Sequence, residues 1–217
     1  MVPVRLGRGE EVKKDILLYG LSETQLFDDL MRWANGTPIH EFTPDFHRLQ
    51  VEHWVWANRG RLTGVVIDVG ARFPRRWIGP EYRTLGLVGC DVIGDLCAMP
   101  LHGSSVDGMI LTEVLEHCEH PFNAIREVRR VLKPGGLLLV TSPFVWPWHG
   151  TEEYRDFWRF TPDAWRLLLK EFSNVVIGAC RWTDEGKQMY DLMRRFECMG
   201  YTAWTTASTG YLCEAIR

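Results

Sequence analysis

Short runs of apolar, often β-branched residues alternate along the chain with segments whose apolar residues recur at helical spacing. The runs expected to form strands are residues 63–69, 84–88, 107–112, 137–141 and 175–177. Near-continuous apolar runs bounded by glycine or polar residues are typical of strands that are buried on both faces. Strands connected through helices predict an α/β protein in which a parallel sheet carries helices on both faces.

Two helices are expected before the first strand. Ser22 and Gln25 have the capping-box spacing, and the apolar residues that follow keep helical intervals as far as Asn35. Thr43, followed by proline and aspartate, predicts the start of a second helix that runs to about Asn58. These helices indicate an N-terminal helical cap, residues 1–60, in front of a domain formed by residues 61–217.

Two further helices are expected between the later strands. One ends at residues 133–136, and the other begins at Thr161. The apolar residues assigned to their buried faces are Phe122, Ile125, Val128 and Val131 in the first helix, and Leu167, Leu168 and Phe172 in the second. A helical segment at about 184–199 and an antiparallel hairpin of residues 201–206 and 211–216 complete the expected fold.

Composition and charge exclude several classes of protein. The 217 residues suffice for a full core without a structural metal ion or disulfide bonds. A net charge of -3 gives no general attraction to nucleic acid or to an acidic membrane, and no signal peptide or transmembrane segment is expected. None of the 6 cysteines forms a C-x-x-C pair, which favours reduced thiols in the cytoplasm.

Candidate ligand-binding residues lie where the expected strands end. In an open parallel sheet a ligand binds beyond the carboxyl ends of the strands. Asp68 and Gly70 stand at the end of the first expected strand, Asp95 follows the second, and Thr112 and Glu113 stand at the end of the third. Acidic side chains accept hydrogen bonds from ribose or amino groups, and glycine allows the backbone to approach a ligand closely. This pattern predicts a nucleotide-like ligand.

Several ordered motifs resemble a known family. They are Asp95–Leu101, Ser105–Asp107, Glu113–His117 and Arg130–Gly136, with Tyr154–Pro162 after them. In order and spacing they are similar to class I S-adenosylmethionine-dependent methyltransferases, especially the small type 11-like group, over residues 63–178. The resemblance implies a Rossmann-like, doubly wound sheet, S-adenosyl-L-methionine as cofactor, and methylation of an oxygen or nitrogen atom of a small-molecule acceptor.

The resemblance also implies which residues bind the cofactor. They are Asp68, Gly70, Ala71, Arg72, Asp91, Asp95, Leu96, Thr112 and Glu113. The Asp95 carboxylate would accept from the adenine amino group, and the Leu96 backbone N–H would serve a ring nitrogen. Thr112 and Glu113 would flank the methionine part of the cofactor.

The chain departs from the family pattern at two places. Arg72 stands where a glycine usually allows close approach, so it either pairs with the methionine carboxylate or fills the site. The acid that binds the ribose in the family corresponds to Val88 in one alignment and to Asp91 in the other. Asp91 is the candidate for this role, and a role as a turn residue is also open for it. Pro74 disfavours a helix directly after the loop. These departures leave open an alternative, a degenerate, non-catalytic protein of the same fold that acts as a binding partner or scaffold.

His149 and His117 are the candidate catalytic residues, because a histidine can act as a base near neutral pH. A packing role for His117 is equally open. Trp148, Arg155 and Arg159 are candidates for binding a planar or anionic acceptor. Residues 117–120 contain metal-ligand side chains, but no second cluster completes a set, so no metal ion is predicted.

Overall fold

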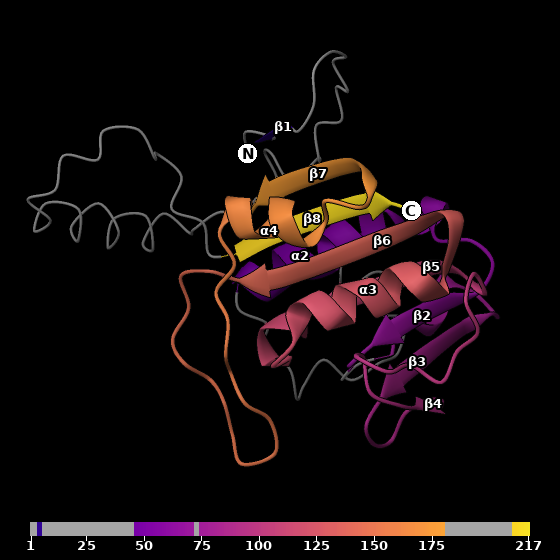
Figure 1. The fold of residues 1–217 in the computed structure, drawn as a ribbon, viewed down its shortest axis with the longest axis horizontal. Helices are drawn as coiled ribbons and strands as arrows, with labels where there is room; N and C mark the ends of the chain where they lie inside the picture. The colour runs from indigo at the N-terminus through magenta and orange to yellow at the C-terminus, as the bar shows by residue number, and fades with distance from the viewer. Residues whose placement is uncertain (1–3, 6–45, 72–73, 181–209) are drawn as a thin grey trace, which may run out of the picture.

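The computed structural model describes residues 4–5, 46–71, 74–180 and 210–217 (Figure 1). One sheet of eight strands has the order β1-β7-β8-β6-β5-β2-β3-β4. The strands are β1 (Val4–Arg5), β2 (Val66–Val69), β3 (Tyr82–Gly86), β4 (Val92–Ile93), β5 (Val106–Thr112), β6 (Leu132–Pro143), β7 (Ser173–Ala179) and β8 (Gly210–Ile216). From β4 to β6 all neighbours are parallel, whereas β8 runs antiparallel to both β6 and β7. The expected doubly wound, mostly parallel sheet is confirmed.

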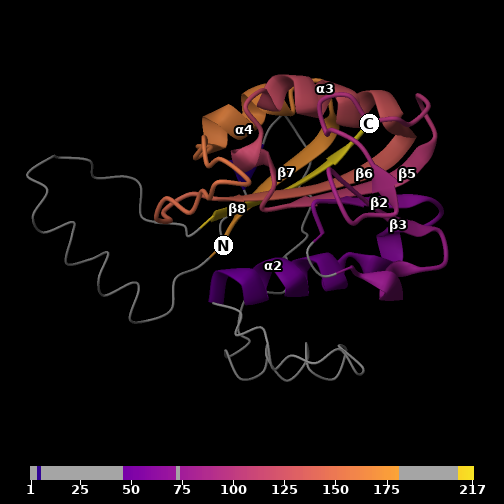
Figure 2. The same ribbon diagram turned by 90° about the horizontal axis from the view of Figure 1, so that it is seen from below.

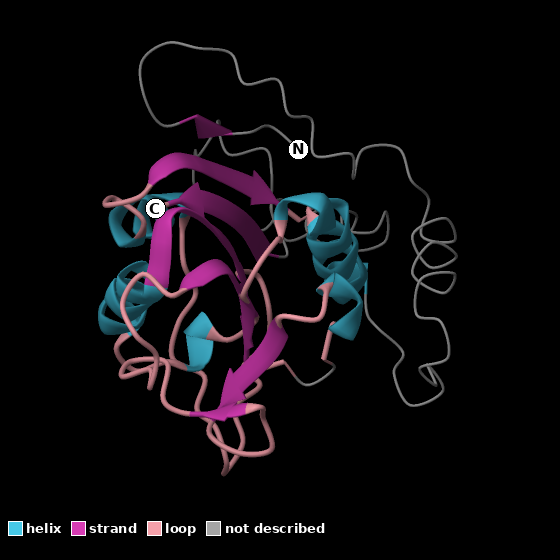
Figure 3. Cartoon of the chain, turned by 90° about the vertical axis from the view of Figure 1, so that its right-hand side faces the viewer, coloured by secondary structure: helices cyan, strands magenta, loops and turns pink. Residues whose placement is uncertain are grey.

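Helices cover both faces of the sheet. The helices are α2 (Phe46–Ala57), α3 (Pro121–Val131) and α4 (Pro162–Leu168), with short 3-10 turns η2 (Arg59–Arg61), η3 (Arg76–Ile78) and η4 (Leu115–His117). Figure 2 shows α2 on one face of the sheet and α3 and α4 on the other, and Figure 3 shows the twisted sheet between these layers. The Thr161 hydroxyl caps α4 by accepting from the Ala164 N–H at 3.2 Å, as its sequence signal predicts.

Two apolar cores lie on the two faces of the sheet. Val51, Trp54 and Val55 of α2 pack in a cluster that includes Ile110 of β5, whereas Leu111 lies in the other cluster, with α3 and α4. Successive residues of β5 therefore point into different cores, and both are buried. This explains why the strand is apolar without alternation. Helix α2, from the expected N-terminal cap, packs in one of these two cores. The expected domain boundary near residue 60 stays a prediction.

The helix faces differ from the expected ones at two positions. Phe122 and Leu167 are each 52% exposed. In α3, Phe122 lies about 100° around the axis from the buried Pro121. In α4, Leu167 lies opposite the buried Trp165. Both expectations are wrong because sequence spacing alone did not fix which stripe of each helix faces the sheet.

The connections between the first strands are short. β3 begins at Tyr82, two positions before the expected start, and Val88 is 82% exposed in the turn beyond it. Between Pro74 and Tyr82 the only helical element is η3, and no helix lies between β3 and β4. No helix of the described residues is both long enough and apolar enough to span a membrane. The expected segments at 22–34, 184–199 and 201–206 lie outside the described residues, whereas the expected strand at 211–216 is present as β8.

Candidate active site

The strand register brings the expected cofactor residues to one edge of the sheet. Asp68 of β2 is level with Ile110 of β5, and Thr112 of β5 is level with Thr141 of β6. The residues after β2 and β5, including Gly70 and Glu113, therefore lie beyond adjacent carboxyl ends. Parallel sheets bind ligands at this edge.

The Asp68 carboxylate is completely buried at the end of β2. Its Oδ2 atom accepts from the Tyr82 hydroxyl at 2.6 Å and from Arg75 Nη1 at 2.7 Å. Its Oδ1 atom is buried and has no hydrogen-bond partner among the described residues. Burial raises the pKa of Asp68 above its usual value, although Arg75 and Tyr82 both act to lower it. One oxygen of this acid is thus held by the protein and the other is not.

Arg75 joins helix α2 to the ends of β2 and β5. Besides Asp68, its guanidinium donates to both carboxylate oxygens of Glu52, at 2.9 and 2.6 Å, and to Thr112 Oγ1 at 3.0 Å. Sequence reasoning weighed Arg72 instead and missed Arg75, whose only signal is its position shortly after the glycine loop. Arg72 itself lies outside the described residues.

Gly70 adopts a left-handed backbone conformation, with φ of 65°. A Cβ atom at this position would lie 2.8 Å from Val114 Cγ2, so the site has no room for a side chain. The exposed Asp95 carboxylate accepts from the Cys97 N–H at 2.7 Å through Oδ1 only, while the neighbouring Leu96 side chain is buried. A side-chain-free backbone at Gly70 and an available acceptor oxygen at Asp95 fit a nucleoside ligand such as S-adenosylmethionine.

The exposed Asp91 carboxylate is hydrogen-bonded to other residues of the protein. Its Oδ2 atom accepts from the backbone N–H and the hydroxyl of Thr84, at 2.8 and 2.9 Å, and its carboxylate pairs with Arg76. The hydrogen bond from Arg76 is the largest of the effects that lower the pKa of Asp91. These contacts match the turn role that the sequence left open; the ribose role stays a prediction.

Glu113 stands directly after β5 in a left-handed conformation, with φ of 56°. Non-glycine residues rarely adopt this conformation, and such strained positions cluster at functional sites. His47 Nε2 of α2 lies 3.0 Å from Oε2, and the Thr141 hydroxyl donates to Oε1 at 2.6 Å. Burial acts to lower the pKa of His47, but the charge of Glu113 and the interactions of the ring with Cys180 and Glu113 together hold that pKa well above its usual value.

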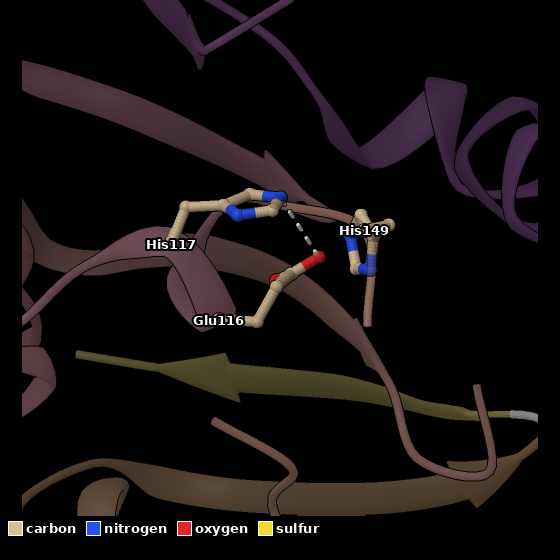
Figure 4. Close-up of side chains that lie close together, drawn as sticks. All are labelled: Glu116, His117 and His149. Atoms are coloured by element: carbon tan, nitrogen blue, oxygen red, sulfur yellow. Dashed lines mark ion pairs between the residues drawn. The ribbon is translucent and has the colours of Figure 1, made fainter. Parts of the chain in front are cut away.

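The two candidate catalytic histidines are brought together from separate segments. His117 belongs to η4 and His149 to the loop of residues 144–161, which runs from β6 to α4 (Figure 4). Their ring centroids are 4.9 Å apart in an edge-to-face arrangement. His117 Nδ1 lies 2.5 Å from the Arg155 carbonyl oxygen, and His149 Nδ1 lies 3.1 Å from Asp156 Oδ2. Burial lowers the pKa of His117.

Glu116 lies beside these histidines and was missed by sequence reasoning. Its side chain is completely buried, and in the part of the chain that the structure describes neither carboxylate oxygen has a hydrogen-bond partner. Burial, and then the charge of Glu113, raise the pKa of Glu116 well above its usual value. The only sequence signal was its position next to His117, which does not predict burial.

The expected acceptor residues take different positions. Trp148 is 69% exposed, and Arg155 is exposed and binds His117 through its carbonyl oxygen. Arg159 donates to both oxygens of Asp156, at 2.5 and 2.8 Å. The hydrogen bond from Arg159 holds the pKa of Asp156 at about 2. Arg159 therefore stabilises the loop of residues 144–161 through its hydrogen bonds to Asp156. Trp148 and Arg155 are exposed to solvent.

Comparisons with known proteins concern the fold and part of the sequence. A family model described as a methyltransferase domain matches residues 70–140. Two similar solved structures are a SAM-dependent methyltransferase from Archaeoglobus fulgidus and the 1,6-didemethyltoxoflavin-N1-methyltransferase from Burkholderia thailandensis, the latter with bound 1,6-didemethyltoxoflavin and S-adenosylhomocysteine. The first has a TM-score of 0.54 and 14% identity and covers 82% of this chain and 97% of its own. The second has a TM-score of 0.54 and 13% identity and covers 88% and 86%.

A shorter likeness connects the chain to a curated protein. An uncharacterized 37.1 kDa protein in transposon TN4556 of Streptomyces fradiae is 40% identical over 62 residues. The matched stretch is 28% of this chain and only 18% of that protein.

The likeness to these solved structures shows a Rossmann-like α/β fold of the kind found in S-adenosylmethionine-dependent methyltransferases. Residues 70–140 form the part that matches the methyltransferase domain family.

Proposed function

We propose that the chain is an enzyme that transfers the methyl group of S-adenosylmethionine to an oxygen or nitrogen atom of a small-molecule acceptor. The observation that carries the proposal is the contact of His117 with His149 at the edge where Gly70 and Glu113 lie. Methyl transfer from a sulfonium is an in-line displacement, so holding both reactants in position contributes most. A base is needed when the acceptor must lose a proton.

The cofactor would extend across the ends of β2, β5 and the loop after β4. Asp95 would accept from the adenine amino group, and the Leu96 N–H would donate to a ring nitrogen. Thr112 and Glu113 would flank the methionine part, with Gly70 giving its backbone access. The cofactor supplies an electrophilic methyl group, and these residues fix where that group lies.

His149 or His117 would remove the acceptor proton. A carbonyl oxygen only accepts, so His117 carries its hydrogen on Nδ1 and leaves Nε2 with a lone pair when the ring is neutral. Asp156 favours the same tautomer in His149. The exposed Trp148, next to His149 in the chain, offers an aromatic face for a planar acceptor.

Isothermal titration with S-adenosylhomocysteine, followed by assay of methyl transfer to a panel of hydroxyl and amino compounds, tests the proposal. Asp95→Ala should weaken binding by roughly tenfold or more, because a hydrogen bond to the adenine is lost. His149→Ala should lower turnover about 10²–10⁴-fold and leave that binding unchanged. The control Asp163→Ala removes an exposed carboxylate in α4 and should change neither quantity. Full affinity in Asp95→Ala would reject the adenine placement.

A non-catalytic binding partner or scaffold of the same fold is the second candidate. The ion pair of Arg75 with Asp68 favours it, because the pair engages the acid of the expected cofactor loop. No heat at millimolar S-adenosylhomocysteine, together with no methyl transfer, would establish this candidate over the enzyme. Either candidate is expected to act in the cytoplasm, because the cysteines form no C-x-x-C pair and their scattered positions favour reduced thiols.

A further inference from the structure

We infer that Glu116, His117 and His149 form a binding site for a first-row divalent transition-metal ion (Figure 4). One ligand atom from each residue lies within 4.8 Å of the other two. Two metal–ligand bonds of about 2.1 Å each span roughly 4.2 Å. Small rotations of the side chains therefore bring all three ligand atoms onto one ion.

No hydrogen bond from the described residues compensates the Glu116 carboxylate. Its side chain is fully buried, its oxygens have no hydrogen-bond partner, and His117 Nε2 is 3.7 Å from Oε1. Buried charges in proteins are paired or coordinate metal ions. A divalent cation at this position would compensate the carboxylate where no hydrogen bond does.

The partners of both imidazoles orient them as ligands. His117 donates through Nδ1 to the Arg155 carbonyl oxygen, and His149 Nδ1 faces Asp156. Metal-binding histidines almost always donate their second ring N–H to a carbonyl or carboxylate, which fixes the tautomer and the ring orientation. Both rings here have that arrangement, and in each the partner leaves Nε2 as the nitrogen with a lone pair.

Backbone contacts hold the two segments of the site together. The N–H groups of Phe157 and Trp158 both donate to the Glu116 carbonyl oxygen, at 2.8 and 3.2 Å. The Trp158 indole N–H donates to the Cys118 carbonyl oxygen at 2.8 Å. The loop of residues 144–161 is thus tied to η4, so the ligands are positioned before an ion binds.

The ligand types select the class of ion. One carboxylate with two imidazoles suits Zn²⁺, Mn²⁺, Fe²⁺ or Co²⁺, whereas Mg²⁺ and Ca²⁺ prefer oxygen ligands throughout. Three protein ligands leave coordination positions open. If the proposed function holds, the two imidazoles would act as metal ligands and not as free bases when the ion is bound, and an acceptor hydroxyl at an open position would lose its proton to water more readily, which favours hydroxyl acceptors. The sequence alone predicts no metal ion, because it does not place His149 beside His117.

Titration of Co²⁺ and Zn²⁺ into the full chain, after treatment with EDTA and desalting, tests the site. We expect a single ion per chain and a visible cobalt spectrum that indicates nitrogen and oxygen ligands. Glu116→Gln and His149→Ala should each weaken binding by roughly 100-fold or more, and Asp156→Asn by about 10–100-fold through the orientation of His149. Absence of a bound ion in the wild-type chain would overturn the inference.

Two controls separate this site from other ligands on the surface. His120→Ala removes an exposed imidazole nearby and should leave binding unchanged. The Cys97 and Cys118 sulfur atoms lie 3.3 Å apart and would be the competing ligands for zinc, so the double variant Cys97→Ser with Cys118→Ser should also retain the ion. A thiolate-to-cobalt charge-transfer band, or loss of binding in the cysteine variant alone, would overturn the inference.

Thermal unfolding measurements distinguish a variant that has lost metal binding from one that does not fold. Zn²⁺ should raise the midpoint of the wild-type chain, because an ion that binds only the folded state stabilises it, and should not raise that of Glu116→Gln. An equal shift in both would contradict the site. S-adenosylhomocysteine binding is measured separately: binding without a metal site would sink only this inference, and a metal site without cofactor binding would sink only the proposed function.

Discussion

Gly70 and Glu113 hold left-handed backbone conformations at the ends of neighbouring strands, β2 and β5. Residues that leave a strand in this conformation turn the chain sharply at the sheet edge. At Gly70 the turn also packs the backbone against Val114, the residue after Glu113. The two strand ends are therefore shaped by each other, and a side chain at Gly70 would disturb both.

Gly70→Ala is expected to destabilise the protein by roughly 1–3 kcal/mol, because alanine is strained at this φ and its Cβ would meet Val114. Gly60→Ala is the matched control, since a Cβ atom at Gly60 would meet nothing within 4 Å. Urea unfolding of both variants measures the difference. Equal free energies of unfolding in the two variants would show that alanine adopts the backbone conformation at position 70 without strain.

Single residues of the site could be predicted only where a motif carried them. Asp68, Gly70 and Glu113 were placed correctly at the sheet edge, because the carboxyl ends of parallel strands meet there. Arg75 and Glu116 were missed, because burial of a charged side chain depends on neighbours that come from distant segments. Neither residue stands in an apolar pattern that would predict its burial.

At the scale of elements, α2 is held to the sheet by charge as well as by its apolar face. Glu52 binds Arg75, and His47 binds Glu113, so two contacts connect this helix to the strand ends. Both contacts lie at the edge where the cofactor is expected. Helix α2 thus takes part in the shape of that edge.

Arg75→Ala is expected to cost about 3–5 kcal/mol, because it leaves the buried Asp68 carboxylate without its cationic partner. The control Arg76→Ala removes a neighbouring arginine whose pair with Asp91 is exposed, and it should change stability little. Chemical unfolding monitored by tryptophan fluorescence checks both variants. A small effect of Arg75→Ala would show that Asp68 is neutral in the folded protein.

The parallel pairing of β5 with β6 could be predicted because a short apolar run is followed there by a helical segment, α3, and a second apolar run. The position of β8 could not. Its sequence indicates a strand, but insertion between β6 and β7 depends on two edges that lie far from it in the chain. The residue pattern of a hairpin indicates which strands pair with their neighbours in sequence. It does not indicate that a later strand pairs with two earlier strands.

At the scale of the whole molecule, the pair of His47 and Glu113 makes stability depend on pH. The pKa of His47 is raised, so its protonated form contributes stability that is fully present below about pH 6.5 and lost as the pH rises through the raised value. Burial acts to raise the pKa of Glu113, but His47 outweighs it and the pKa is lowered. Glu113 therefore contributes stability above about pH 4.3 that is lost as the pH falls through its lowered value.

The stability advantage of the wild-type chain over Glu113→Gln is expected to shrink as the pH rises from about 6.5 into the alkaline range, because the imidazolium is lost. Free energies of unfolding from urea titrations at constant ionic strength measure this difference. A constant gap between wild type and variant over that range would contradict the pairing of these charges.

The place of β8 also determines when folding can finish during protein synthesis. Residues 210–216 form the strand between β6 and β7, yet they follow both in the chain. Until the ribosome has released these residues, the nascent chain has no partner for the facing edges of β6 and β7. Unpaired strand edges of this kind promote aggregation, so the growing polypeptide needs protection until β8 is available to pair with both edges.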